Sequence, residues 1–215
     1  MKQLFMRQNG SMRLILFFCG YGQDERPFPV VKAHGPDLAL VYDYEDSTFD
    51  CSVYEKYQCI DVVSWSMGVM MAAVTLGNGA LKVRKAVAVN GTIEGIDDEF
   101  GIATKMWNAT EAALCPASVL KFYRRMCGVK DAAFYLEHAP ARSLDGLRRE
   151  LAFLKHTAAG KIRKSFHYSR AYVGLGDRII PAQNQLRSWN AQGVSAVQGE
   201  FAHFPLEILS YELEL

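Results

Sequence analysis

The sequence has no long apolar run and almost no net charge. No segment approaches the roughly 20 apolar residues that span a bilayer, and the N-terminus has no apolar stretch behind a basic region. We therefore expect neither a signal peptide nor a membrane anchor. The formal net charge of +1 argues against wholesale nucleic-acid binding, although it is compatible with a local basic patch.

Cysteine and histidine patterns typical of disulfide frameworks and metal sites are also missing. The five cysteines are an odd number without a C-x-x-C pair, as in a reducing compartment, so we expect a cytoplasmic protein. No two histidines stand at i, i+4 with a carboxylate between them, so no metal site is predicted. The glycines of CGYG at 19–22 lack the spacing and the lysine of a phosphate-binding loop. No cofactor is expected.

The chain is rich in apolar residues that are arranged as alternating strands and helices. Half of its 215 residues are hydrophobic, enough for the core of one domain with a sizeable insertion. The alternation is typical of a parallel sheet covered on both faces, an α/β fold. At the N-terminus, the turn QNGS at 8–11 joins two strand-like runs, 2–6 and 12–18, and predicts a β-hairpin.

The alternation breaks between residues 93 and 164, where the sequence is helical in composition. We expect residues 1–92 and 165–215 to form the core of the fold. Residues 93–164 are then an inserted helical cap over the carboxyl ends of the strands, where such folds bind ligands.

The stretch that organises these predictions is SWSMG at 64–68. A buried-type strand precedes it and an Ala/Met-rich helix follows it. This is the context of a nucleophile elbow, usually G-x-S-x-G, with Ser64 here in place of the first glycine. Small residues flank the nucleophile because the turn is strained and tightly packed. Ser66 is the candidate nucleophile; the alternative is that it only caps the following helix.

Two later residues complete a catalytic set with Ser66. Asp177 lies in a glycine turn after a strand-like segment, and His203 follows the last short strand-like segment. Taken alone, a loop aspartate is usually a turn residue and a single histidine is usually satisfied locally. Together the three follow the chain order of the α/β-hydrolase triad, each just past a strand. We therefore predict an α/β-hydrolase-type fold with Ser66, Asp177 and His203 as catalytic residues.

A set of motifs spread over nearly the whole chain resembles one family. The motifs are LILFFCGYG at 14–22, DY at 43–44, VSWSMGV at 63–69, VNGT at 89–92, FYRRMC at 122–127, GDRIIP at 176–181 and AHFP at 202–205. In combination they resemble the BioG-type pimeloyl-[acyl-carrier protein] methyl ester esterases. The resemblance implies hydrolysis of the methyl ester of a carrier-bound pimeloyl chain, with release of methanol, in biotin biosynthesis. Tyr21 stands where a Trp is more usual, and Cys19 where Ala or His is expected.

The triad implies acyl transfer by a serine nucleophile. Ser66 attacks the ester carbonyl, His203 moves the proton, and Asp177 orients the imidazole. The oxyanion is expected at the backbone amides of Met67, the residue after the nucleophile, and of Tyr21, in the loop after an early strand.

Positive charge is concentrated in the predicted cap. Residues 121–164 contain 11 Lys and Arg against 4 Asp and Glu, a net charge of +7 that leaves −6 on the rest. A solvated helix surface explains any single arginine, but the clustering favours docking of an acidic partner. The clustered residues are Arg124, Arg125, Arg148, Arg149, Lys155, Lys161, Arg163 and Lys164.

Acyl carrier proteins are acidic, so we expect the carrier to dock on the cap. The leading candidates for this contact are Arg124, Arg125, Arg148 and Arg149, with Tyr21 at the substrate slot. Neither nucleic acid nor a membrane is expected as a partner, and a monomer is expected. Two alternatives stay open: a broader carboxylesterase or thioesterase with the same triad, and a non-catalytic carrier-binding module on a hydrolase scaffold.

Overall fold

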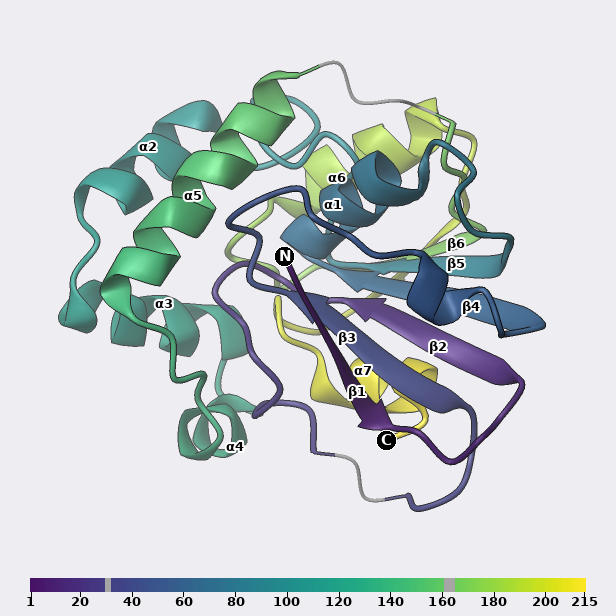
Figure 1. Cartoon of the computed structure of the whole chain (residues 1–215). Helices are drawn as coiled ribbons and strands as arrows, with labels where there is room; N and C mark the ends of the chain where they lie inside the picture. The colour runs from purple at the N-terminus through teal and green to yellow at the C-terminus, as the bar shows by residue number, and fades with distance from the viewer. Residues whose placement is uncertain (30–31, 161–164) are drawn as a thin grey trace.

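The computed structural model describes residues 1–29, 32–160 and 165–215, and its centre is a seven-stranded sheet (Figure 1). The strands are β1 (Lys2–Arg7), β2 (Arg13–Phe18), β3 (Asp37–Tyr42), β4 (Cys59–Trp65), β5 (Val83–Val89), β6 (Arg170–Gly174) and β7 (Ala196–Gly199). Their order in space is β1-β3-β2-β4-β5-β6-β7. β1 is antiparallel to β3, and the other neighbouring pairs are parallel. The predicted mostly parallel sheet is confirmed.

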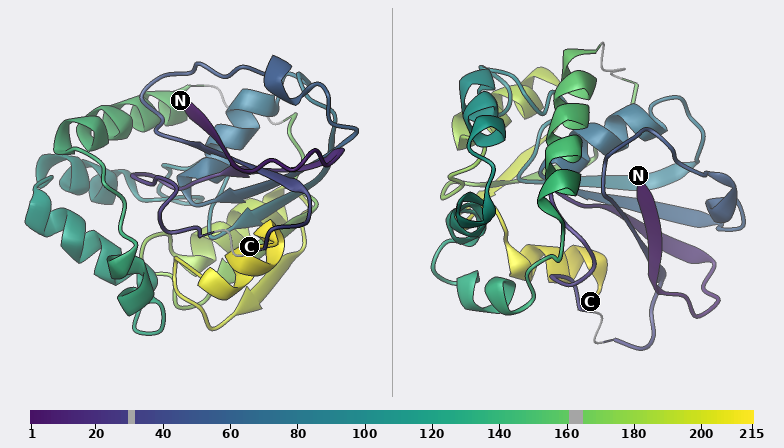
Figure 2. Two further views of the ribbon diagram at one scale, coloured as in Figure 1. Left: turned by 60° about the horizontal axis from the view of Figure 1, so that its bottom comes forward. Right: turned by 60° about the vertical axis from the view of Figure 1, so that its left-hand side comes forward.

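Helices cover both faces of the sheet because its central strands are apolar on both sides. Successive side chains of a strand point to opposite faces, and accordingly Leu16 and Phe17 of β2 belong to two different core clusters. Helices α1 (Met67–Leu76) and α6 (Ala182–Ala191) pack on the face of Leu16, and α7 (Leu206–Leu213) packs on the other face (Figure 2). A short 3-10 turn, Ser52–Tyr54, precedes β4.

The predicted N-terminal β-hairpin is wrong. Both strands exist, but β3 lies between them and pairs with each. Every residue of β3 is buried, so this strand needs a hydrogen-bonded neighbour on both edges. The Asn-Gly turn serves the start of β3 instead of closing a hairpin: the amides of Asn9 and Ser11 donate to Asp37 Oδ1 at 2.9 and 3.3 Å.

Four helices stand apart from the sheet layers, at the left of Figure 1. They are α2 (Thr104–Ala112), α3 (Pro116–Cys127), α4 (Ala132–Glu137) and α5 (Leu144–Ala159), and we call them the cap helices. All four fall inside the range 93–164, whose limits as a cap remain a prediction. Lys161, Arg163 and Lys164 of the predicted basic cluster lie outside the described residues. Over the part of the chain that is described, no helix has both the length and the apolarity needed to cross a bilayer.

Candidate active site

Ser66 occupies a strained turn between β4 and α1. Its φ of 57° and ψ of −127° place a non-glycine residue in a region that L-residues rarely adopt. The turn is also crowded: a Cβ added to Gly68 would lie 2.2 Å from the carbonyl oxygen of Phe18, so only glycine fits there. The small residue that sequence reasoning expected after the serine is therefore required by the close approach of α1 to β2.

Ser64, which replaces the first glycine of the usual motif, is fully buried. Its Oγ lies 3.1 Å from the Tyr168 hydroxyl, which also donates to the carbonyl of Val69 at 2.9 Å. The serine thus joins β4 to the first turn of α1 through a tyrosine from outside the motif. This contact shows how a residue with a side chain is accommodated at the elbow.

The structure brings Ser66, His203 and Asp177 into one chain of hydrogen bonds. His203 Nε2 lies 2.8 Å from Ser66 Oγ, and His203 Nδ1 lies 2.8 Å from Asp177 Oδ2. All three side chains are buried. A carboxylate only accepts, so Nδ1 carries the proton and Nε2 is left to accept from the serine hydroxyl. This arrangement can remove a proton from Ser66 as it attacks a carbonyl.

Asp177 is held by donors on both carboxylate oxygens. The amides of Ile179 and Ile180 donate to Oδ1 at 2.7 and 3.0 Å, and Gln185 Nε2 donates to Oδ2 at 2.9 Å. Gln185 is fully buried on α6. Sequence reasoning missed this residue, since a glutamine eight positions after an aspartate carries no recognisable signal.

The loop that carries His203 is held by side chains at the carboxyl ends of β4 and β5. Trp65 Nε1 donates to the His203 carbonyl at 2.7 Å, and Asn90 Nδ2 donates to the carbonyls of Ala202 and His203 at 2.8 and 3.0 Å. Asn90 Oδ1 in turn accepts the amide of Gly174, at the end of β6, at 2.7 Å. The asparagine of VNGT is therefore a tie between β5, β6 and the histidine loop, a role that sequence reasoning did not assign.

Tyr21 and Met67, the residues whose amides are expected to bind the oxyanion, line the same cavity as Ser66. A Cβ built on Gly20 would be 3.1 Å from Ser66 Cβ, so the loop after β2 passes next to the serine. Met67 is the first residue of α1, and the first amides of a helix have no intrahelical acceptor. Among the described residues, the backbone hydrogen bonds between elements include none from the Tyr21 amide.

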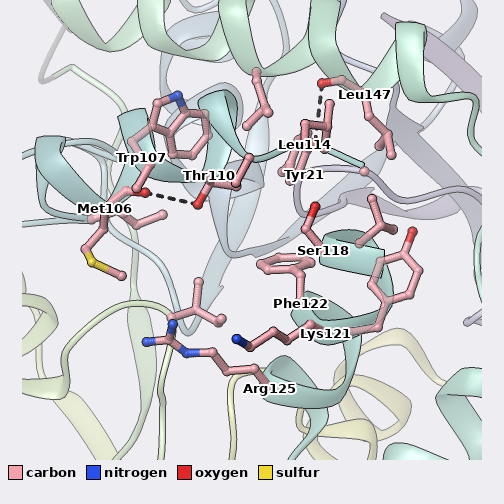
Figure 3. A pocket seen from close by; sticks show the side chains of 18 of the residues that line it. Tyr21, Met106, Trp107, Thr110, Leu114, Ser118, Lys121, Phe122, Arg125 and Leu147 are labelled. Carbon is pink, nitrogen blue, oxygen red and sulfur yellow. Dashed lines mark hydrogen bonds between the residues drawn. The ribbon is translucent and has the colours of Figure 1, made fainter. Parts of the chain in front are cut away.

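A cavity of about 380 Å³ opens above Ser66 and Met67. Its walls are mostly apolar and come from α2, α3 and α5, with Trp107, Phe122 and Leu147 among them (Figure 3). The Tyr21 ring borders it, packs edge-on to Trp107 and Phe122, and donates its hydroxyl to the Leu147 carbonyl at 3.3 Å. The cavity suits a flexible apolar chain that ends at the serine.

Comparison with known proteins agrees with this geometry. Residues 1–208 match a family model described as "Pimeloyl-ACP methyl esterase BioG". The chain belongs to the BioG family. A crystal structure of BioG from Haemophilus influenzae is 32% identical, has a TM-score of 0.84, and is matched over 97% of this chain and 96% of that one. The BioG resemblance predicted from the motifs is confirmed.

Two further relatives extend the comparison. A Bacteroides fragilis protein named malonyl-[acyl-carrier protein] O-methyltransferase is 35% identical over 93% of this chain, which spans only 41% of that protein. A bromoperoxidase from Bacillus anthracis is 12% identical with a TM-score of 0.67, over 98% of this chain and 89% of that one. The latter likeness concerns the fold, and it confirms the predicted α/β-hydrolase class. Membership of an esterase family likewise confirms the expected class of enzyme.

The four arginines expected to bind a carrier differ in their surroundings. Arg148 pairs with Asp145 at 2.9 Å, and Arg149 pairs with Glu45 at 2.6 Å. Arg124 and Arg125 make no ion pair with any carboxylate of the described residues. Arg125 borders the cavity together with Lys121 (Figure 3) and with Arg178, the residue after Asp177. Arg178 was not among the predicted binding residues, although it stands in the GDR segment.

A buried ion pair joins α5 to the segment just before it and to the end of β3. Arg142 Nη1 lies 3.1 Å from Glu150 Oε2, and Arg142 also pairs with Asp43. Burial outweighs the attraction of Arg142 and raises the pKa of Glu150 to about 7. The other ionisable side chains that act on this carboxyl group or feel its charge are Asp43, Cys19, Tyr21, Tyr44 and Tyr123. Burial raises the pKa of the thiol and of the phenols, so these groups stay neutral near pH 7.

The raised pKa of Glu150 predicts a pH dependence of stability. Between the ordinary pKa of 4.5 and the folded value of about 7, the native state binds more protons than the unfolded state. Stability therefore falls as pH rises through this window, by about 3 kcal/mol for this group. Urea unfolding from pH 4.5 to 8 should show the loss in the wild type and not in Glu150→Gln. Parallel curves for the two proteins would contradict the assignment.

Metal binding finds no support in the side-chain clusters. Over residues 1–29, 32–160 and 165–215, no group of three or more His, Cys, Asp and Glu side chains is arranged to hold a metal ion.

Proposed function

We propose that this chain is a serine esterase that hydrolyses the methyl ester of pimeloyl-[acyl-carrier protein], giving pimeloyl-[acyl-carrier protein] and methanol. The observation that carries the proposal is the hydrogen-bonded chain Ser66, His203 and Asp177 at 2.8 Å per contact, at the bottom of an apolar cavity. The description of the BioG family model supplies the substrate.

The reaction proceeds in two halves. Ser66 Oγ attacks the ester carbonyl and its proton passes to His203 Nε2, while the amides of Met67 and Tyr21 donate to the oxyanion. The bond to the methoxy group then breaks, and the His203 proton leaves with it as methanol. In the second half, a water gives a proton to His203 Nε2 and attacks the acyl-serine carbonyl. The bond to Ser66 Oγ then breaks, His203 returns the proton to Oγ, and the released acid ionises to the carboxylate in solvent.

The cavity supports an acyl chain of this kind as the ligand. A pimeloyl methyl ester has no charge along its length, so it loses little on leaving water for walls such as Trp107, Phe122 and Leu151. The name of the Bacteroides fragilis relative describes O-methylation of malonyl-[acyl-carrier protein]. O-methylation of a carboxyl group forms a methyl ester, so a part similar to this chain occurs in a protein named for forming a methyl ester on a carrier-bound acyl group.

Charge complementarity supports docking of the carrier on the cap, where Arg125 also borders the cavity. Acyl carrier proteins are acidic, and Arg124, Arg125, Arg148 and Arg149 remain the proposed contacts. We expect Arg124 and Arg125 to contribute more to carrier affinity, because the charge of an arginine without an acidic partner is not neutralised within the protein. An arginine already paired, such as Arg149 with Glu45, must give up that contact first.

Charge reversal should separate the two pairs of arginines. Arg124→Glu with Arg125→Glu should raise KM for the carrier-bound ester by about tenfold or more, and less at high salt. Arg148→Glu with Arg149→Glu is the matched variant, and we expect a smaller rise. Steady-state kinetics with a small neutral ester should show no change in either double variant. Equal damage to both substrates would assign the arginines to folding instead.

The direct test of a serine esterase is labelling by a fluorophosphonate probe. Only a serine activated by a neighbouring base reacts quickly, so the wild type should be labelled and Ser66→Ala should not. A non-catalytic carrier-binding module would leave both proteins unlabelled. A thioesterase with the same triad would be labelled but would release the free carrier from the substrate instead of methanol.

We also propose that the chain works in the cytoplasm as a monomer. The five cysteines are all free in the structure, which fits a reducing compartment. Size-exclusion chromatography with light scattering would test the oligomeric state.

A further inference from the structure

The loop that carries the Tyr21 amide makes its polar contacts largely with the cap. The Gly22 amide donates to Glu150 Oε2 at 3.3 Å, and Arg142 Nη1 donates to the Gln23 carbonyl at 2.9 Å. Glu150 is on α5, and Arg142 stands just before it. A Cβ on Gly22 would meet Leu147 Cδ2 of the same helix at 3.0 Å, so the loop also fits closely against α5.

The peptide unit between Tyr21 and Gly22 is fixed at both of its polar atoms. Its N–H bonds to Glu150, and its carbonyl accepts from Gln23 Nε2 at 3.1 Å. Gln23 is itself held, because its Oε1 accepts from the Tyr135 hydroxyl on α4 at 2.8 Å. The preceding peptide carries the Tyr21 N–H, and its direction depends on the orientation of the fixed unit, since only the dihedrals of Tyr21 separate them.

Burying the charged side chains of Glu150 and Arg142 costs free energy, which suggests that the pair has a role beyond stability. Glu150 is fully buried, and its Oε1 has no hydrogen-bond partner among the described residues. A buried ion pair is often no more stable than an apolar contact of the same shape. The chain nevertheless places this pair where it orients a loop beside the nucleophile.

We propose that Glu150 and Arg142 are positioning residues for the oxyanion hole, so that seating of the cap on the core sets the direction of the Tyr21 amide. The inference rests on the proposed function, because it assigns a task within that mechanism. It means that the cap does more than enclose the acyl chain. Helix α5 carries Arg148 and Arg149 on its exposed side, and Glu150 faces the loop on its buried side.

The test compares Glu150→Ala with Glu212→Ala on a small neutral ester, p-nitrophenyl acetate. Glu212 is also a buried acid in an ion pair, with Lys85 at 3.0 Å, but it lies on α7 away from the cavity. Glu150→Ala should lower kcat by about 10- to 100-fold with KM within about twofold, because one oxyanion donor is misdirected. Glu212→Ala should lower stability and leave kcat unchanged. Glu150→Gln still presents an acceptor to the Gly22 amide and should recover most of kcat.

A second readout separates positioning from general damage. A trifluoromethyl ketone forms a tetrahedral adduct with the serine and places an oxyanion in the hole, whereas the matching alcohol does not. In Glu150→Ala the ketone should bind about 10- to 100-fold more weakly and the alcohol as in the wild type. Equal weakening of both ligands, or unchanged kcat in a folded variant, would overturn the inference.

The experiment stays decisive if Glu150→Ala does not fold. Arg142→Lys keeps the charge but has a single nitrogen, which cannot replace both Nη1, on the Gln23 carbonyl and Glu150, and Nη2, on Asp43. It should weaken binding of the ketone by about three- to tenfold while sparing the alcohol. A selective effect supports the inference, and its absence overturns it. Failure of the proposed function would look different, because the wild type itself would then lack esterase activity that depends on Ser66.

Discussion

Replacing Ser66 by alanine is expected to lower kcat by about 10⁴- to 10⁶-fold on any ester substrate. Ser66 Oγ is the nucleophile that becomes acylated, and among the described residues no other hydroxyl bonds to His203 in the chain with Asp177. The loss should appear in kcat, since the cavity walls that bind the acyl chain are untouched. Methanol release from the carrier-bound ester, followed under single-turnover and steady-state conditions, measures it.

The control for Ser66→Ala is its stability. The substitution keeps a small residue in a strained turn and removes one hydroxyl, so the urea midpoint should stay close to that of the wild type. Near-normal turnover of a folded Ser66→Ala protein would mean that another group is the nucleophile.

Asp177→Asn is expected to lower kcat by about 10⁴-fold. Among the described residues, the Asp177 carboxylate accepts at both oxygens: from the Ile179 and Ile180 amides at Oδ1, and from Gln185 and His203 at Oδ2. An asparagine must turn its NH₂ toward one of these sets. Facing His203, it forces the imidazole proton onto Nε2, which then cannot accept from Ser66; facing the amides, it sets donor against donor.

Activity across pH separates the tautomer effect from unfolding. Asp50→Asn is the matched control, because Asp50 also caps a turn, accepting from the Ser52 amide at 2.9 Å, but lies outside the site. That variant should keep full activity, whereas Asp177→Asn should be slow at every pH where it stays folded. Comparable activity in the two variants would remove Asp177 from the mechanism.

Much of the site could be predicted from the sequence because its key residues stand in short segments with recognisable local patterns. The elbow around Ser66 is a strand, a tight turn and a helix within a few positions. Ser66 directly follows β4, and Asp177 and His203 stand in the loops that follow β6 and β7. In a parallel sheet the carboxyl ends of neighbouring strands lie along one edge, so strand order in the chain was enough to expect convergence.

Other features depend on pairings between distant segments, which no local pattern encodes. Asn9-Gly10 has the residues of a hairpin turn, yet the fully buried β3 takes the place between the two strands. The contact of Gln185 with Asp177 depends on how α6 packs. The pairing of Arg149 with Glu45 joins residues 104 positions apart. The composition of the cap therefore could not distinguish paired from unpaired arginines.

The most direct test of the whole account is intact-mass analysis of the acyl carrier protein after incubation of pimeloyl-carrier methyl ester with this protein. We expect the carrier to lose the methyl group alone and to keep its acyl chain, and we expect Ser66→Ala to leave the substrate unchanged. A carrier stripped of the whole acyl chain, or a substrate untouched by the wild type, would contradict it.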